Sequence, residues 1–337
     1  MGLNNMLKKS TTLLLITVTL FFSACSSKKV FEPKNVNGSW KNSSESSSKI
    51  VDTNSEIAKL ENGKLLTKDS VIDVDIKDNY RLLSSSDGWV ISSTVDGKID
   101  LVNISNTSIV KEFKLKKTIA TASVQNDILA VLFADNEIAL YSTLTKELLL
   151  KEQGNAPIAV DARIIKPYFM NDLIIFSTLD GKIVIVNSTT KKKLRTVIVS
   201  TKDVFNNIIY FNIINNKIVA ATSNKILSLA SKENRAKYEI RSIAYAGGNI
   251  YLATKQGELI SLTPDLQLQA KLKFPFAHFV GMIAKDDRVY LLEQQGYIIE
   301  ASSDLSEYAI YSADVENGLI FVGDKAFYVN DEIISVE

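Results

Sequence analysis

The stretch NDLIIFSTLDGKIVIVN, residues 171–187, holds two apolar runs on either side of an Asp-Gly pair. Both runs are rich in β-branched and aromatic residues, which favour β-strands. Asp180-Gly181 favours a tight hairpin turn, because the turn needs a positive φ that glycine adopts without strain. We therefore expect two antiparallel strands here, with apolar residues such as Ile174 and Ile183 in the core.

This hairpin pattern recurs along the chain. Seven further copies begin at Glu56, Asp87, Asn126, Asn215, Gly248, Asp286 and Asn317. The turns of the eight copies align on Gly63, Gly97, Asn136, Gly181, Asn224, Gly257, Gly296 and Lys325. Successive turns lie 29 to 45 residues apart and about 37 on average, which is close to the ~40 residues of a four-stranded propeller blade.

The repeat length predicts an all-β chain, folded as an eight-bladed β-propeller over residues 49–337, with seven blades as the alternative. The hairpins leave room for two more strands in each blade. Residues 193–199 are expected to form the outer strand of one blade, and residues 205–211 the inner strand of the next. No stretch beyond residue 25 sustains a capped helical period over about ten residues. A β-sandwich does not explain eight hairpins at one period.

Residues 1–24 have the features of a secretory signal peptide. Their apolar run over 13–22 is too short to cross the ~30 Å of hydrocarbon in a bilayer. The segment ends in FSAC at residues 22–25, which resembles the cleavage box of bacterial lipoproteins. Cys25 is the only cysteine, so we expect it to carry lipid and to anchor the chain without a transmembrane span. The alternative is an ordinary secretory signal with an incidental thiol.

Residues 25–48 are expected to be the lipidated cysteine followed by a flexible tether. They are rich in Ser, Asn and Lys and lack hydrophobic periodicity, so their reach as a coil is on the order of 25 Å. Trp40 leaves two placements open: exposed within the tether, or docked with Gly38 and Ser39 as an edge strand. The closure of the ring is also open, since either the C-terminal strand over 333–336 or the segment around Trp40 can complete the last blade.

The charged residues are evenly balanced, with 39 Lys and Arg against 38 Asp and Glu. This balance argues against a nucleic-acid partner, which requires a basic face or stripe. His278 is the only histidine, so a multi-histidine metal site is excluded, and we expect it to be a hydrogen-bonded strand residue. We expect no catalytic residue, no metal site and no cofactor.

The segments STLDGKI at 177–183 and TVDGKI at 94–99 resemble the pyrroloquinoline-quinone-like repeats of β-propellers. With the cleavage box and eight blades, the chain is similar to the BamB-like outer-membrane assembly lipoproteins. The resemblance implies a non-catalytic scaffold, anchored by lipid in the outer membrane and facing the periplasm. It also implies that the chain binds the barrel-inserting subunit and nascent outer-membrane proteins. Family repeats close with a tryptophan, whereas Trp89 is the only tryptophan of residues 49–337, so we expect aliphatic packing between the blades.

Two other functions are compatible with this fold. Quinone-dependent dehydrogenases share it, but they need a calcium–carboxylate site and much longer chains, and the single cysteine and scarce tryptophan argue against this class. A propeller lipoprotein can instead bind a small ligand or a cell-wall component in its central channel. Tyr168, Tyr210 and His278 are the candidate channel residues, because each falls at an expected innermost strand.

Overall fold

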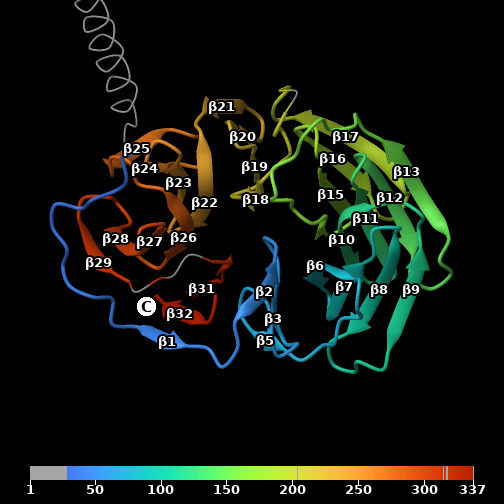
Figure 1. The fold of residues 1–337 in the computed structure, drawn as a ribbon. Helices are drawn as coiled ribbons and strands as arrows, with labels where there is room; N and C mark the ends of the chain where they lie inside the picture. The colour runs from blue at the N-terminus through green and yellow to red at the C-terminus, as the bar shows by residue number, and fades with distance from the viewer. Residues whose placement is uncertain (1–28, 203, 314, 316–317, 337) are drawn as a thin grey trace, which may run out of the picture.

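The computed structural model describes residues 29–202, 204–313, 315 and 318–336. These residues form 32 strands and no helix. The strands make eight four-stranded antiparallel sheets, which stand as blades around a central axis (Figure 1). The predicted all-β, eight-bladed propeller is confirmed, and the seven-bladed alternative is wrong. Within the described ranges there is no helix of the length and hydropathy needed to cross a membrane.

Blades 1 to 4 follow one another along the chain, with their strands given from the axis outward. Blade 1 holds β2 (Ile50–Thr53), β3 (Ala58–Leu60), β4 (Leu65–Leu66) and β5 (Val71–Ile72). Blade 2 holds β6 (Arg81–Ser86), β7 (Trp89–Ser93), β8 (Lys98–Asn103) and β9 (Val110–Lys114). Blade 3 holds β10 (Ile119–Gln125), β11 (Ile128–Phe133), β12 (Glu137–Ser142) and β13 (Leu148–Gln153). Blade 4 holds β14 (Tyr168–Met170), β15 (Leu173–Ser177), β16 (Lys182–Asn187) and β17 (Lys192–Ile198).

Blades 5 to 8 complete the ring. Blade 5 holds β18 (Tyr210–Ile214), β19 (Lys217–Ala221), β20 (Lys225–Leu229) and β21 (Glu233–Lys237). Blade 6 holds β22 (Ile240–Ala246), β23 (Asn249–Thr254), β24 (Glu258–Leu262) and β25 (Leu268–Lys273). Blade 7 holds β26 (Phe279–Lys285), β27 (Arg288–Glu293), β28 (Tyr297–Ser302) and β29 (Tyr308–Ser312). Blade 8 holds β30 (Ile320–Val322), β31 (Ala326–Val329), β32 (Glu332–Ser335) and, as its outer strand, β1 (Ser43–Glu45).

The core is divided into eight hydrophobic clusters, one at each interface between neighbouring blades. Ile174 and Phe176 of blade 4 pack against Leu132 of blade 3, and Ile183 packs on the other side against blade 5. Each of these three blade 4 side chains is fully buried. Strand residues alternate between the two faces of a sheet, so each blade supplies apolar side chains to both neighbours. Most side chains in these clusters are aliphatic, as predicted, but buried aromatic residues such as Phe133, Phe176 and Tyr251 also pack between the blades.

The aligned hairpin turns sit at equivalent places in most blades. Seven of them join the second and third strands of a sheet, whereas Lys325 joins the first and second strands of blade 8. The turn of blade 8 that is equivalent to the other seven lies between β31 and β32, at Asn330 and Asp331. Gly181 shows why glycine is needed, since its φ is +82° and a Cβ there would lie 2.6 Å from the Ser200 carbonyl oxygen.

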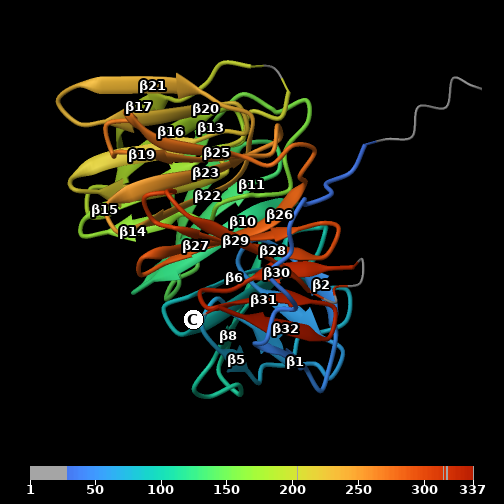
Figure 2. The same ribbon diagram turned by 90° about the vertical axis from the view of Figure 1, so that its left-hand side faces the viewer.

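The sequence predicts a free tether over residues 25–48, whereas the described part of this segment packs on the propeller and helps to close the ring. Residues 29–45, here called the strap, run along blades 7 and 8 (Figure 2), and β1 pairs with β32. The backbone N–H of Trp40 donates to the Ser312 carbonyl (2.8 Å), and its indole Nε1 donates to the Ser335 carbonyl (3.0 Å). Trp40 is therefore docked on the propeller. The strap belongs to the propeller because its apolar side chains pack against the blades.

Candidate functional site

One end of the propeller carries the segments that join successive blades, and we call this end the linker face. In blades 2 to 7 the segment that leaves the blade is hydrogen-bonded to the turn between its second and third strands. The backbone N–H groups of Leu115, Val199, Phe274 and Ala313 donate to the carbonyls of Gly97, Gly181, Gly257 and Gly296, at 2.8 to 2.9 Å. The aligned turns of blades 2 to 7 therefore lie on the same face as the linkers.

The longest linker, residues 154–167 between blades 3 and 4, enters the ring at this face and runs along the axis toward the opposite end. Its Ile164 carbonyl accepts a hydrogen bond from the Ser55 hydroxyl of blade 1 (2.9 Å). Its Lys166 Nζ donates to the Ser85 carbonyl of blade 2 (2.7 Å). Its Arg163 guanidinium donates to the Arg241 carbonyl of blade 6. We call residues 154–167 the axial linker, because they join blades on opposite sides of the ring.

Charged groups fix the axial linker in place. Lys166 pairs with Glu56 (3.0 Å), and Arg163 pairs with Asp161. Burial opposes ionisation of Asp161, but the hydrogen bond and charge of Arg163 hold the pKa of that carboxyl below its ordinary value. Next to this region, Lys68 donates to the Val322 carbonyl (2.8 Å), and burial lowers the pKa of its ammonium group. These groups are structural, since each is engaged within the chain.

Apolar side chains are exposed on the linkers of this face. Ile158 is 77 % exposed, and Val204 and Phe205 of the next linker are 44 % and 51 % exposed. Phe276, in the linker between blades 6 and 7, is 57 % exposed. Phe205 and Phe276 have φ values of 48° and 66°. Bulky residues rarely adopt such left-handed backbone, which is more common at functional sites than elsewhere.

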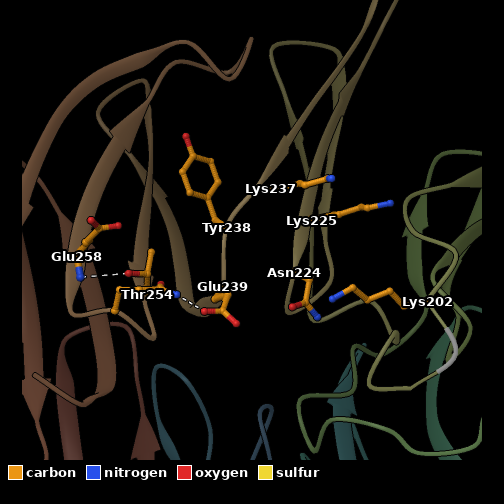
Figure 3. A pocket seen from close by; sticks show the side chains of 9 residues that line it. Lys202, Asn224, Lys225, Lys237, Tyr238, Glu239, Thr254 and Glu258 are labelled. Carbon is orange, nitrogen blue, oxygen red and sulfur yellow. Dashed lines mark hydrogen bonds between the residues drawn. The ribbon is translucent and has the colours of Figure 1, made fainter. Parts of the chain in front are cut away.

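A groove on the linker face contains a cluster of lysines. A cavity of about 640 Å³ over blades 5 and 6 is lined by Lys202, Lys225, Lys237, Tyr238 and Glu239, among others. Lys225 and Lys237 are direct partners across β20 and β21, and both side chains point the same way (Figure 3). We call Lys202, Lys225 and Lys237 the lysine cluster. Within the described chain none of the three forms an ion pair.

A second cavity continues the groove toward the axial linker. It has a volume of about 560 Å³ and shares Lys202 and Asn224 with the first, and Val204 and Phe205 also line it. The Phe205 N–H donates to the Ala159 carbonyl (2.9 Å), which ties the two long linkers together. The groove thus places positive charge beside exposed apolar side chains, a combination suited to a protein segment that bears carboxylates.

The three predicted channel residues occupy separate environments. Tyr168 opens β14 and its ring lies 5.6 Å from that of Phe211 in the next blade. Tyr210 opens β18, its hydroxyl accepts a hydrogen bond from Asn212 (3.3 Å), and burial raises its pKa to about 12. The His278 N–H, just before β26, donates to the Glu293 carboxylate (2.9 Å). Each lies at the linker end of an innermost strand, and the contacts made by each are with different neighbours.

The sequence reasoning did not identify the axial linker or the groove. The inner strand predicted over 205–211 begins only at Tyr210, because residues 199–209 are a linker. Spacing was the available indication: 45 residues separate Asn136 from Gly181, and 43 separate Gly181 from Asn224, against about 37 on average. The extra residues are those of the two long linkers. Cys25, the expected lipid site, lies outside the described residues.

No set of three or more His, Cys, Asp or Glu side chains within the described ranges is arranged to hold a metal ion. The charged side chains of the linker face are used in a different way. The carboxylate of Asp161 is paired with Arg163, and deeper along the axial linker Glu56 is paired with Lys166. The lysine cluster is a group whose charge is available to an outside partner.

The ring, the strap and the grooved linker face define the chain as an eight-bladed β-propeller with one elaborated end. No protein-family model matches the sequence. The chain is similar to plasminogen-binding protein PgbB of Helicobacter pylori. Identity to the protein of strain 26695 is 25 % over 347 aligned positions, covering 89 % of this chain and 64 % of that protein. For strain J99 it is 30 % over 213 positions, covering 62 % and 39 %. The chain therefore spans less than two thirds of either relative.

Solved structures share the fold at low sequence identity. BamB from Moraxella catarrhalis superposes with a TM-score of 0.67 at 10 % identity, covering 88 % of this chain and 98 % of that one. The C-terminal WD40 domain of Sif2 gives 0.64 at 12 % identity, covering 88 % and 99 %. The designed protein Ika8 gives 0.60 at 12 % identity, covering 89 % and 99 %. These structural similarities support the BamB-like propeller fold. At such low sequence identity they show the fold alone and not the function.

Proposed function

We propose that this chain is a non-catalytic, protein-binding propeller lipoprotein, anchored in the outer membrane through Cys25 and facing the periplasm. Its partner surface is the groove of the linker face, and the lysine cluster is the observation that carries the proposal. Lys225 and Lys237 stand directly opposite each other, an arrangement of like charges that destabilises a sheet. An acidic segment bound between them and Lys202 removes that repulsion.

The apolar residues beside the cluster give the groove its second contribution. Val204 and Phe205 line it and are exposed, so a bound segment buries aromatic and aliphatic surface as well as pairing its carboxylates. Interfaces draw affinity from such buried apolar anchors and draw specificity and association rate from charge complementarity. The axial linker runs along the central channel, where it contacts blades 1, 2 and 6. For that reason we favour protein binding over a small ligand held on the axis.

The partners that we propose are the barrel-inserting subunit of the outer-membrane assembly machinery and nascent outer-membrane proteins. The repeats over 94–99 and 177–183 and the cleavage box at 22–25 support this assignment. Affinity purification from cross-linked envelopes tests it. We expect the wild-type chain to recover the barrel-inserting subunit, and the double variant Lys225→Glu/Lys237→Glu to lose it.

The control is Lys146→Glu/Lys232→Glu, which reverses two exposed charges in turns on the opposite face. This control is expected to recover the same partners as wild type. Equal recovery by both double variants would show that the groove is not the binding site. Absence of the barrel-inserting subunit from every sample would contradict the assembly role.

Plasminogen is a second candidate partner, because the curated relatives with 25–30 % identity are named as plasminogen-binding proteins. Surface plasmon resonance with immobilised plasminogen and the purified chain distinguishes plasminogen from the assembly machinery as the partner. Saturable binding that Lys225→Glu/Lys237→Glu weakens and Lys146→Glu/Lys232→Glu preserves would assign plasminogen to the groove. No binding would leave the assembly role as the proposed function.

A further inference from the structure

The strap begins at the edge of the linker face, where aromatic side chains pack together beside a lysine. Lys29 lies with its Nζ 5.4 Å from the Phe276 ring centroid. Phe31 is 5 % exposed and packs edge-on against Phe274 and Tyr297, with ring centroids 6.3 and 5.7 Å apart. The start of the strap is thus fixed beside the linker of blades 6 and 7.

Phe276 is held outward by a tight turn. The Ala277 N–H donates to the Phe274 carbonyl (3.1 Å), which closes a four-residue turn with Pro275 second and Phe276 third. The φ of Phe276 is 66°. The third position of such a turn usually belongs to Gly or Asn, yet here it presents a phenylalanine that is 57 % exposed. The turn geometry aims an aromatic side chain into solvent.

Lysines line the cavity beside this exposed ring. A cavity of about 1070 Å³ between the strap and the linker is lined by Lys29, Lys34 and Lys273 together with Phe276. Glu32 is the one acidic residue on its lining. An outward aromatic side chain with lysines around it suits the interface of a bilayer, where apolar side chains enter the headgroup boundary and lysines meet anionic lipids.

The distance to the anchor selects a bilayer as the occupant. Three residues separate Lys29 from Cys25, and four extended steps along a chain cover at most ~14 Å. A lipid on Cys25 therefore keeps Lys29 and Phe276 close to the membrane surface. We propose that Phe276, with Lys29 and Lys34, is a membrane contact that turns the linker face toward the bilayer. This inference rests on the lipid anchor of the proposed function.

Tryptophan fluorescence in vesicles tests the contact. The full-length acylated chain, with acylation of Cys25 verified by mass spectrometry, is reconstituted into phosphatidylethanolamine–phosphatidylglycerol vesicles with brominated acyl chains. Phe276→Trp is the probe, and Leu144→Trp is the matched control, since Leu144 is 69 % exposed in a turn of the opposite face. Wild type gives the background of Trp40 and Trp89.

We expect bromolipid to quench the added fluorescence of Phe276→Trp at least threefold more than that of Leu144→Trp. Adding Lys29→Glu/Lys34→Glu is expected to reduce this quenching in anionic vesicles and to have little effect in phosphatidylcholine vesicles. Equal quenching at the two probe positions, or quenching at Leu144→Trp alone, overturns the contact.

Different outcomes test the lipid anchor on Cys25 and the membrane contact of Phe276. A chain that carries no lipid on Cys25 overturns the anchor and this inference together, while binding at the lysine cluster is still measured separately in solution. An acylated chain without preferential quenching at position 276 overturns this inference and leaves the proposed function standing. Quenching that disappears when a second protein is added would identify that protein as the occupant instead of the bilayer.

Discussion

Single residues at the turns set how closely each linker approaches its blade. Gly181 combines a positive φ of 82° with a backbone that leaves no room for a side chain, as Ser200 and Asn206 lie against it. Asn136 occupies the equivalent turn of blade 3 with a φ of 69°. Its side chain accepts from the Leu179 N–H (2.8 Å) and donates to the Asn155 carbonyl (2.9 Å), which joins two blades.

We expect Gly181→Ala to destabilise the propeller by about 3 kcal/mol, from left-handed backbone strain and crowding together. Gly88→Ala is the matched control, because Gly88 also has a positive φ but nothing lies within 4 Å of its added Cβ. That control is expected to cost only about 1–2 kcal/mol. Urea unfolding measures both, and equal losses would contradict the role of crowding.

Glu293 gives the fold a specific pH dependence. Burial raises the pKa of its carboxyl above the ordinary value of 4.5, although backbone N–H groups of His278 and Gln295 donate to it. The unfolded chain therefore releases this proton at a lower pH than the folded chain. Raising the pH from 4.5 through the elevated pKa then favours unfolding.

We expect the free energy of unfolding of wild type to fall relative to that of Glu293→Gln as the pH rises through this window. Urea unfolding of both chains at several pH values between 4 and 7 checks the sign. The prediction is contradicted if the difference in free energy of unfolding between the two chains stays constant with pH. It is also contradicted if wild type becomes more stable relative to the variant as the pH rises.

At the scale of elements, the strap contributes the contacts that close the ring. Trp40 packs edge-on against Tyr311 and Tyr290, with ring centroids 5.2 and 6.0 Å away. We expect Trp40→Ala to lower the free energy of unfolding by about 3 kcal/mol, and Trp40→Phe, which loses the hydrogen bond to Ser335, by about 1 kcal/mol. Thermal unfolding ranks the two variants. No loss in Trp40→Ala would mean that the strap does not close the ring.

The axial linker is the other element that joins distant blades. Arg163→Ala removes its bonds to Asp161 and Arg241, so we expect amide hydrogen exchange over 159–166 to rise at least tenfold while the blades stay protected. Arg195→Ala, on the exposed outer strand of blade 4, is the control. Exchange that rises equally in both variants would argue against a specific lock at the axis.

The strands could be predicted from sequence more readily than the strap that closes the ring and the linkers that form the groove. Hairpins such as 171–187 depend on local alternation and an Asp-Gly turn, and the structure confirms β15 and β16 at those residues. The strap could not be assigned, because Trp40 and Ser335 are 295 residues apart and no local pattern encodes their bond. For the same reason the lysine cluster went unrecognised: Lys202 meets Lys225 and Lys237 only once the linker has folded over blade 5.

At the scale of the whole molecule, function depends on how charge is distributed and not on its sum. The net charge is only +1, yet the lysine cluster and the start of the strap, with Lys29 and Lys34, both place lysines on the linker face. Figure 2 shows the blue start of the strap at one end of the propeller, the end that also carries the groove. A lipid anchor there brings the binding groove close to the membrane.

Site-specific photo-cross-linking in intact envelopes tests the central claim most directly, which is that the linker face binds a protein partner. Benzoyl-phenylalanine is placed at Val204, which lines the groove, and at Leu144 on the opposite face. We predict a discrete adduct from position 204 that Lys225→Glu/Lys237→Glu abolishes, and none from position 144. An adduct from position 144 with none from position 204 would contradict this account.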